Sequence, residues 1–210
     1  MVNILASILL NLINKMKLTS LKSDKTKVLE SPLINSQTMQ PSMKKNMKNV
    51  LKKDLARKNF NEEDAFVSDT VYRLNTDLDP DNDINNYPSP DREQIVLQSL
   101  MITMDMLQDI RDLLGCPVIT ESVFRCLLLN RMLESSDDSQ HLKGEAADIK
   151  SPKFGTPEEI MLHLKKNNFE VDQCLCEGSW LHVSKKEKGN RNMYGYYMPD
   201  HTGKRIFRAI

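Results

Sequence analysis

Apolar residues recur at three- and four-residue steps through residues 90–114, and this is the clearest periodic pattern in the chain. Such spacing places the apolar side chains on one face, so it predicts a helix with a buried stripe that ends at Gly115. The stripe consists of Val96, Leu100, Thr103, Met104, Leu107, Ile110 and Leu114. A second helix is predicted over 156–169, because Thr156 and Glu159 have the spacing of a capping box.

Short apolar runs between turn-forming residues predict strands in the C-terminal half of the chain, with a further short helix at 124–134. The expected strands cover 116–122, 144–151, 170–176, 179–185, 191–199 and 205–210. An acidic, turn-rich loop is expected at 77–91. Because helices come first and closely spaced strands follow, the pattern is typical of an α+β domain. We therefore expect a small antiparallel sheet flanked by helices.

The first 60 residues have a different pattern. Residues 1–14 are mostly apolar with helical spacing, which predicts a short amphipathic helix that packs on the body of the protein or on a partner. A membrane-spanning helix needs roughly 20 apolar residues, and a signal peptide carries its positive charges before the apolar run, whereas here they follow it. A weak membrane or signal role is the alternative. Residues 19–49 predict a flexible linker, and residues 50–60 predict a short basic helix.

The net charge also differs between the first 60 residues and the rest of the chain. The chain has 29 basic and 29 acidic residues, so its formal net charge is zero. Residues 1–60 hold 12 basic residues against 3 acidic ones, a balance of +9, whereas residues 61–210 carry −9. This asymmetry predicts a basic N-terminal extension at 1–60 and a separate folded domain at 61–210. Without a chain-wide basic excess, no nucleic-acid partner is expected.

Two of the four histidines stand in a pattern that suits a metal ion. His141 is followed seven residues later by Asp148, and His182 lies further on in the run WLHVS. Two histidines and one aspartate are three ligands, which leaves the fourth tetrahedral position of a catalytic zinc ion open for water. Zinc lowers the pKa of the bound water to about 7. Glu177 is then the natural acceptor of the proton that this water loses. Spacing by itself does not single out this set, since any chain with four histidines contains some such combination.

Two longer motifs around these residues make the sequence similar to a known family. The pattern Ser-x-His-x-x-Gly-x-Ala-x-Asp is met by Ser139, His141, Gly144, Ala146 and Asp148. The pattern Glu-x-x-Trp-x-His is met by Glu177, Trp180 and His182. With these motifs the sequence resembles the zinc D-alanyl-D-alanine carboxypeptidases, a family that includes phage endolysin peptidases and shares its fold with the hedgehog signalling domain. The resemblance covers roughly residues 66–190 and does not extend to residues 1–60.

The resemblance implies an α+β fold with a zinc ion held by His141, Asp148 and His182, and with Glu177 as the general base. It also implies that Arg125 contacts a carboxylate or carbonyl oxygen of the substrate and steadies the developing oxyanion. That role suits a guanidinium, which offers a rigid fork of donors. Further substrate or supporting contacts are expected from Ser122, Ser139 and Trp180.

Local geometry adds two expectations. Gly144 permits a tight backbone turn between the first ligand and the strand that follows. Trp180 and His182 are two residues apart on a strand and share a face, whereas Glu177 is an odd number of residues from His182. A straight strand would point Glu177 to the face opposite His182. We therefore expect a bend at 178–179 that turns the Glu177 side chain toward the metal site.

The sequence departs from the family pattern at two places. Val123-Phe124 stand where the family has Gly-Tyr, which removes a phenol beside the substrate, and residues 131–138 replace a glycine-rich loop at the border of the cleft. Two hypotheses therefore stay open. In the first, the protein is a zinc-dependent peptidase that hydrolyses an amide bond in the peptidoglycan peptide stem, as a D-Ala-D-Ala carboxypeptidase or an endolysin-type endopeptidase. In the second, it is a non-catalytic zinc-containing module that binds the cell wall or another protein.

The endolysin resemblance also implies a setting. A phage protein for lysis, or for penetration of the host wall, would be made in the cytoplasm and act at the cell wall, or it would travel with the virion. Residues 1–60 would make electrostatic contact with anionic polymers of the envelope, and salt should weaken that contact. In a third hypothesis this basic segment carries the main function of the chain.

Overall fold

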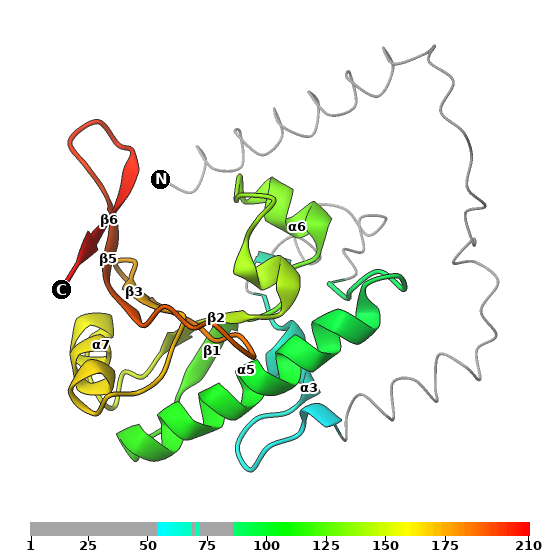
Figure 1. Ribbon diagram of the computed structural model, residues 1–210, viewed down its shortest axis with the longest axis horizontal. Helices are drawn as coiled ribbons and strands as arrows, with labels where there is room; N and C mark the ends of the chain where they lie inside the picture. The colour runs from blue at the N-terminus through cyan, green and yellow to red at the C-terminus, as the bar shows by residue number, and fades with distance from the viewer. Residues whose placement is uncertain (1–53, 69, 72–85) are drawn as a thin grey trace. The chain divides into compact units, whose positions relative to one another are not determined.

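The computed structural model describes residues 54–68, 70–71 and 86–210 (Figure 1). The predicted helix at 1–14, the predicted linker at 19–49 and most of the acidic loop at 77–91 lie outside the described residues. Within the described ranges, no helix combines the length and the apolarity needed to cross a bilayer. Leu55 and Phe60 belong to the predicted basic extension, and both are buried in the hydrophobic core of the described domain.

The long helix predicted from the apolar stripe is confirmed as α5 (Glu93–Leu114), and every residue of that stripe is buried. It ends at Gly115, whose φ of 65° lies in the left-handed region and whose N–H donates to the Arg111 carbonyl. A short helix, α3 (Glu62–Phe66), precedes it in the chain.

Three further helical segments follow α5. They are α6 (Leu127–Met132), the 3₁₀ helix η2 (Gln140–Lys143) and α7 (Pro157–Lys166). The capping box at the start of α7 is confirmed, because the Thr156 hydroxyl accepts from the Glu159 N–H while the Glu159 carboxylate accepts from the Thr156 N–H.

Six strands form one sheet in the order β1-β2-β4-β3-β5-β6. They are β1 (Ile119–Ser122), β2 (Ala146–Lys150), β3 (Gln173–Cys176), β4 (Leu181–Ser184), β5 (Met193–Pro199) and β6 (Arg205–Ala209). The α+β class and the antiparallel sheet are confirmed, with one exception among the pairings, because β3 and β5 run parallel. Both sides of β4 are already paired, with β2 and β3, so the next strand cannot pair with β4 and instead joins the outer edge of β3. It enters from the end where β3 begins and therefore runs in the same direction.

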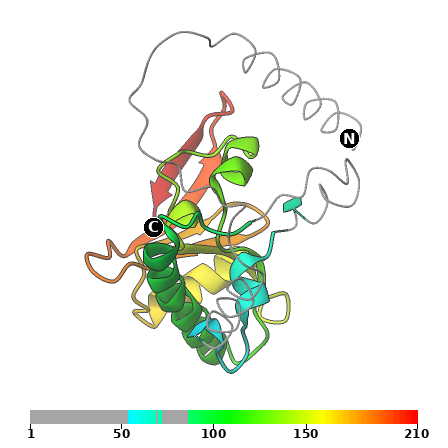
Figure 2. The same ribbon diagram turned by 90° about the vertical axis from the view of Figure 1, so that its right-hand side faces the viewer.

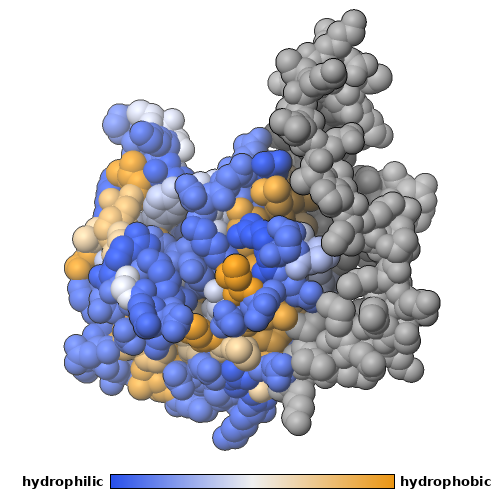
Figure 3. Space-filling view, turned by 45° about the vertical axis from the view of Figure 1, so that its right-hand side comes forward, coloured by the Kyte–Doolittle hydropathy of each residue, from blue (hydrophilic) through white to orange (hydrophobic). Residues whose placement is uncertain are grey.

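The sheet buries one face and presents the other to a cleft. Alternate residues of its central strands belong to the core, namely Ala147, Ile149, Cys174, Cys176, Leu181 and Val183. They pack with the buried stripe of α5 and with Ile160, Met161 and Leu164 of α7. The intervening residues of the same strands line the cleft, among them Asp148, Leu175 and His182. In the view of Figure 3 the described surface is mainly hydrophilic with separate hydrophobic patches.

The last two strands form a hairpin that extends away from α5 in both views (Figures 1 and 2). Tyr197 pairs with Phe207 across this hairpin. One consequence for the site is that the C-terminal residues of the chain reach the cleft, since Tyr197, Arg205 and Phe207 all line it.

Candidate metal centre

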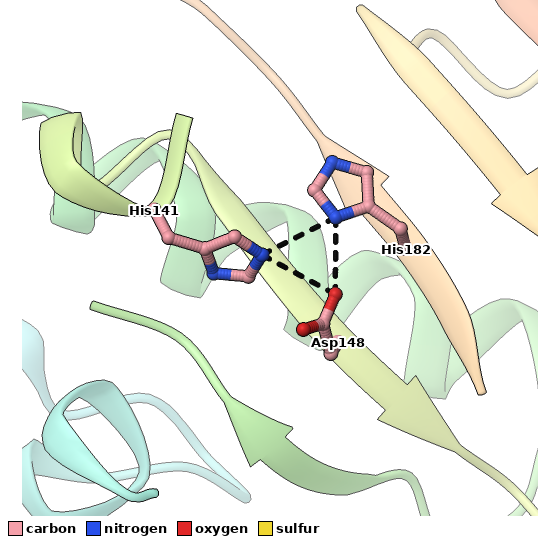
Figure 4. Close-up of side chains that lie close together, drawn as sticks. All are labelled: His141, Asp148 and His182. Carbon is pink, nitrogen blue, oxygen red and sulfur yellow. Dashed lines mark hydrogen bonds and ion pairs between the residues drawn. The ribbon is translucent and has the colours of Figure 1, made fainter. Parts of the chain in front are cut away.

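The central strands bring two of the predicted ligands directly together. Asp148 on β2 is the cross-strand partner of His182 on β4, and Ser122 on β1 pairs with Asp148 from the other side. Residues opposite one another in a sheet point to the same face, so the carboxylate and the imidazole meet over the cleft. The third residue, His141, comes from η2 and points toward the same place (Figure 4).

Gly144 allows η2 to lie close against α5. Its φ of 71° lies in the left-handed region, and a Cβ there would stand 2.8 Å from the Val96 carbonyl oxygen of α5. The buried Thr103 hydroxyl of α5 also donates to the Gly144 carbonyl at 2.8 Å. The long helix thus fixes the backbone between His141 and the strand that carries Asp148. The tight turn predicted at Gly144 is present there.

Three donor atoms converge at the centre. His141 Nε2 lies 3.3 Å from His182 Nδ1 and 3.3 Å from Asp148 Oδ1, and His182 Nδ1 lies 3.0 Å from Asp148 Oδ1. All three side chains are buried. A tetrahedral ion with bonds of about 2.0–2.1 Å holds its ligand atoms about 3.3 Å apart, so the triangle has the size that such an ion needs.

Hydrogen bonds outside the triangle orient two of the donors. His141 Nδ1 lies 2.7 Å from the Val123 carbonyl. Because a carbonyl only accepts, this nitrogen carries the proton and leaves the lone pair of Nε2 free for a metal. Arg125 Nη2 donates to Asp148 Oδ2 at 2.7 Å, which directs Oδ1 at the imidazoles.

Burial and charge act on the same groups. Burial lowers the pKa of His141 and outweighs the opposing effect of the Asp148 carboxylate. Burial works to raise the pKa of Asp148, but the charge and hydrogen bonds of His141 and His182 outweigh it and hold that pKa well below the usual range. Both shifts favour a neutral imidazole beside a carboxylate anion, which are the forms that bind a metal ion.

Arg125 has a different set of contacts from the one that the resemblance implied. Its side chain is 12% exposed and is occupied by the protein itself, through Asp148 and through a bond from Nε to Ser122 Oγ at 3.0 Å. Ser122, which was predicted to touch substrate, therefore also holds the guanidinium. Both residues line the cleft, so a role toward substrate stays a prediction.

Glu177 lies in the same cleft at the end of β3, and strand β3 explains its direction. Leu175 is the cross-strand partner of His182, and Glu177 is two residues beyond Leu175, so the same face continues to Glu177. The turn that follows it includes Gly178 with a φ of 92°. Burial raises the pKa of the Glu177 carboxyl, and the nearby Asp148 adds to this, while His182 and Arg205 act against it.

The cleft around these groups has a volume of about 1200 Å³. Ser139 and Trp180 line it, as predicted for substrate contacts. One side is the β5–β6 hairpin, and the other is the loop after α6, which contributes Leu133, Glu134, Ser135, Ser136 and Asp138. Val123 and Phe124 are buried, and Phe124 packs edge-on against Phe66.

Two residues near the centre were not found from the sequence. Asn86 is buried and bonds through its side chain to backbone groups of Phe124 and Cys126, the neighbours of Arg125. Arg205 on β6 pairs with Glu177. Neither was singled out from the sequence, because each acts on segments at least 20 residues away in the chain.

A buried His-Asp-His group in an open cleft, with a second carboxylate beside it, is the arrangement of a metal-dependent hydrolase. Residues 82–184 match the family model described as Peptidase M15. The chain therefore carries a Peptidase M15 domain, a metallopeptidase domain with the D-Ala-D-Ala carboxypeptidase and hedgehog-type fold. No curated protein matches the chain.

Proposed function

We propose that this protein is a zinc-dependent peptidase that hydrolyses an amide bond in the peptide stem of peptidoglycan. The bond would be the terminal D-Ala-D-Ala bond of a carboxypeptidase or an internal bond cut by an endolysin-type endopeptidase. The observation that carries the proposal is the triangle of donor atoms, 3.0–3.3 Å on each side, in a cleft that also holds Glu177. The Peptidase M15 match supports chemistry on a peptide bond.

The donor set fits zinc. Two imidazole nitrogens and one carboxylate oxygen are common zinc ligands, and three protein ligands leave a position open toward the cleft. His141, Asp148 and His182 would hold the ion. When bound, zinc polarises a carbonyl oxygen and makes a water molecule acidic enough to lose a proton near neutral pH.

Glu177 would move the proton. Its carboxylate accepts a proton from the attacking water and returns it to the nitrogen of the leaving amine, which completes hydrolysis without a net change in the enzyme. Burial raises its pKa, so the protonated form needed in the second half of the reaction is easier to reach. Arg125, Ser139 and Trp180 line the cleft and would orient the peptide.

The cell wall would be the site of action. Cytoplasmic synthesis followed by delivery to the wall, or transport with a virion, fits a role in phage lysis or wall penetration. Residues 1–60 carry a balance of +9 and would bring the domain to anionic polymers of the envelope. Wall binding by the full chain should then weaken steeply with salt, and binding by residues 54–210, which keep the core residues Leu55 and Phe60, should not.

The test uses the full-length protein loaded with zinc, on purified cell walls and on a peptide that ends in D-Ala-D-Ala. Mass analysis of the released muropeptides identifies the bond. Release by the wild type together with loss in Glu177→Gln supports the proposal. Equal, background release by both proteins rules it out.

The departures from the family pattern favour a second candidate, a zinc-containing module that binds wall without cutting it. Phe124 is buried and supplies no hydroxyl to the cleft, and the loop after α6 forms one of the cleft walls. This candidate predicts wall binding that survives Glu177→Gln and no muropeptide release by either protein. Robust release by the wild type excludes it.

A further inference from the structure

Asp148 and Glu177, two of the carboxylates that line the cleft, are each held at one oxygen by an arginine. Arg125 Nη2 donates to Asp148 Oδ2 at 2.7 Å, and Arg205 Nη2 donates to Glu177 Oε2 at 2.6 Å. The other oxygen of Asp148 faces the two imidazoles. The other oxygen of Glu177, Oε1, accepts no hydrogen bond from the part of the chain that the structure describes. In both carboxylates the arginine thus occupies one oxygen and leaves the other free of it, Oδ1 in Asp148 and Oε1 in Glu177.

Arg205 is itself held in place before any substrate binds. Its guanidinium carbon lies 4.7 Å from the centre of the Tyr197 ring, and Nη2 also donates to the Tyr197 carbonyl at 3.0 Å. A cation stacked on an aromatic ring gains attraction and loses rotational freedom. Both residues belong to the β5–β6 hairpin, which lies beyond residues 82–184 of the family match.

We propose that Arg205 is a positioning residue for Glu177 and that the β5–β6 hairpin is therefore part of the catalytic unit. By holding Oε2, Arg205 keeps the carboxylate in one orientation and leaves Oε1 as the oxygen that accepts the proton of the attacking water. This inference deepens the proposed peptidase function and rests on it. Arg205 acts through Glu177, so loss of its guanidinium acts on the proton transfer and leaves substrate affinity in place.

The charges around Glu177 agree with this role. The side chain is 14% exposed. Of the titratable groups around it, Arg205 from β6 favours its anion and Asp148 from β2 opposes it, while His182 from β4 favours the anion only when its imidazole is protonated. Loss of the Arg205 charge should therefore raise the pKa of Glu177 further and release its side chain from its orientation.

The first measurement follows kcat and KM against pH for the full-length, zinc-loaded protein. Arg205→Met should lower kcat roughly tenfold, because a misplaced catalytic group transfers protons slowly, and should leave KM within about twofold. The acid limb of the profile should move to higher pH, and Arg205→Lys should restore much of the rate. Arg208→Met is the matched control, since Arg208 lies on the same strand an odd number of residues away and faces the opposite side.

Each other outcome overturns the proposal. Wild-type kcat and an unmoved acid limb in Arg205→Met mean that the ion pair does nothing in catalysis. A rise in KM with unchanged kcat makes Arg205 a substrate-binding residue. An equal loss of rate in Arg208→Met makes the effect structural.

The second measurement does not depend on activity. Carbon-13 NMR of the Glu177 carboxyl, assigned with Glu177→Gln, reports its titration in the wild type, in Arg205→Met and in Arg208→Met. A rise of roughly one pH unit in Arg205→Met only supports the proposal, and an unchanged titration refutes it. If the wild type and Glu177→Gln both fail to cut any wall, the peptidase function fails while this titration still decides whether Arg205 controls Glu177.

Discussion

Asn86 joins the two segments that carry Arg125 and the end of α3, and its replacement is a sharp test of the structure. Its side-chain Nδ2 donates to the Phe66 carbonyl at 3.0 Å and to the Phe124 carbonyl at 2.9 Å. Its Oδ1 accepts from the Cys126 N–H at 2.8 Å. Asn86 is 5% exposed, so water does not replace these bonds when the side chain is removed.

The expected cost of Asn86→Ala follows from these three bonds. An intramolecular hydrogen bond contributes about 1 kcal/mol net, and a buried polar group left without a partner costs about 1–3 kcal/mol. Three backbone groups lose their partner, so the free energy of unfolding should fall by about 3–5 kcal/mol. That is a large fraction of the roughly 5–15 kcal/mol that stabilises a typical domain.

Urea denaturation of the full-length protein, followed by circular dichroism, measures this loss. Asn167→Ala is the matched control, because Asn167 also donates through its side chain to a backbone carbonyl, that of His163, but at an exposed helix end. It should cost less than about 1 kcal/mol, since the His163 carbonyl still accepts from the backbone N–H of residue 167 and is open to water. If Asn86→Ala costs no more than Asn167→Ala, the bonds assigned to Asn86 do not stabilise the fold.

Gly144→Ala should lower the free energy of unfolding by about 2–4 kcal/mol, because an L side chain is strained at its positive φ and its Cβ would press on α5; an unchanged melting temperature would contradict this. His141→Ala should reduce bound zinc well below one ion per chain after dialysis, as measured by mass spectrometry of the metal. Wild-type stoichiometry in that variant would count against the ligand assignment. Burial works to raise the pKa of Asp172, but hydrogen bonds from Arg191 and Lys186 lower it to about 2. A depressed pKa contributes stability above the unfolded value of about 3.9, and that stability is lost as the pH falls toward 2. Asp172→Asn should therefore flatten the stability curve between these pH values, and an unchanged curve would refute the assignment.

The elements that depend on local pattern were predictable. The stripe of α5 and the capping box of α7 each use residues within a few positions of one another, and the structure confirms both. The meeting of His141, Asp148 and His182 was also predicted, because the resemblance carried by the two motifs implied these three residues as one ligand set.

The remaining features depend on partners far apart in the chain. The parallel pairing of β3 with β5 depends on which of the two sheet edges β5 joins, and no residue of β5 signals that edge. Counting residues from His182 predicted the bend at 178–179, which is present, but the count did not reveal that β3 sets the face of Glu177 through Leu175. The pairing of Arg205 with Glu177 also needs the folded hairpin, so no spacing in the sequence predicts it.

The central claim is that the zinc-loaded domain cuts the peptide stem of peptidoglycan with Glu177 as its base. Mass analysis of muropeptides released from purified cell walls, by the wild type and by Glu177→Gln at equal zinc content, tests it most directly. The account predicts one new peptide terminus with the wild type and release reduced roughly a hundredfold or more in Glu177→Gln. Equal release by the two proteins, or no release by either, would contradict it.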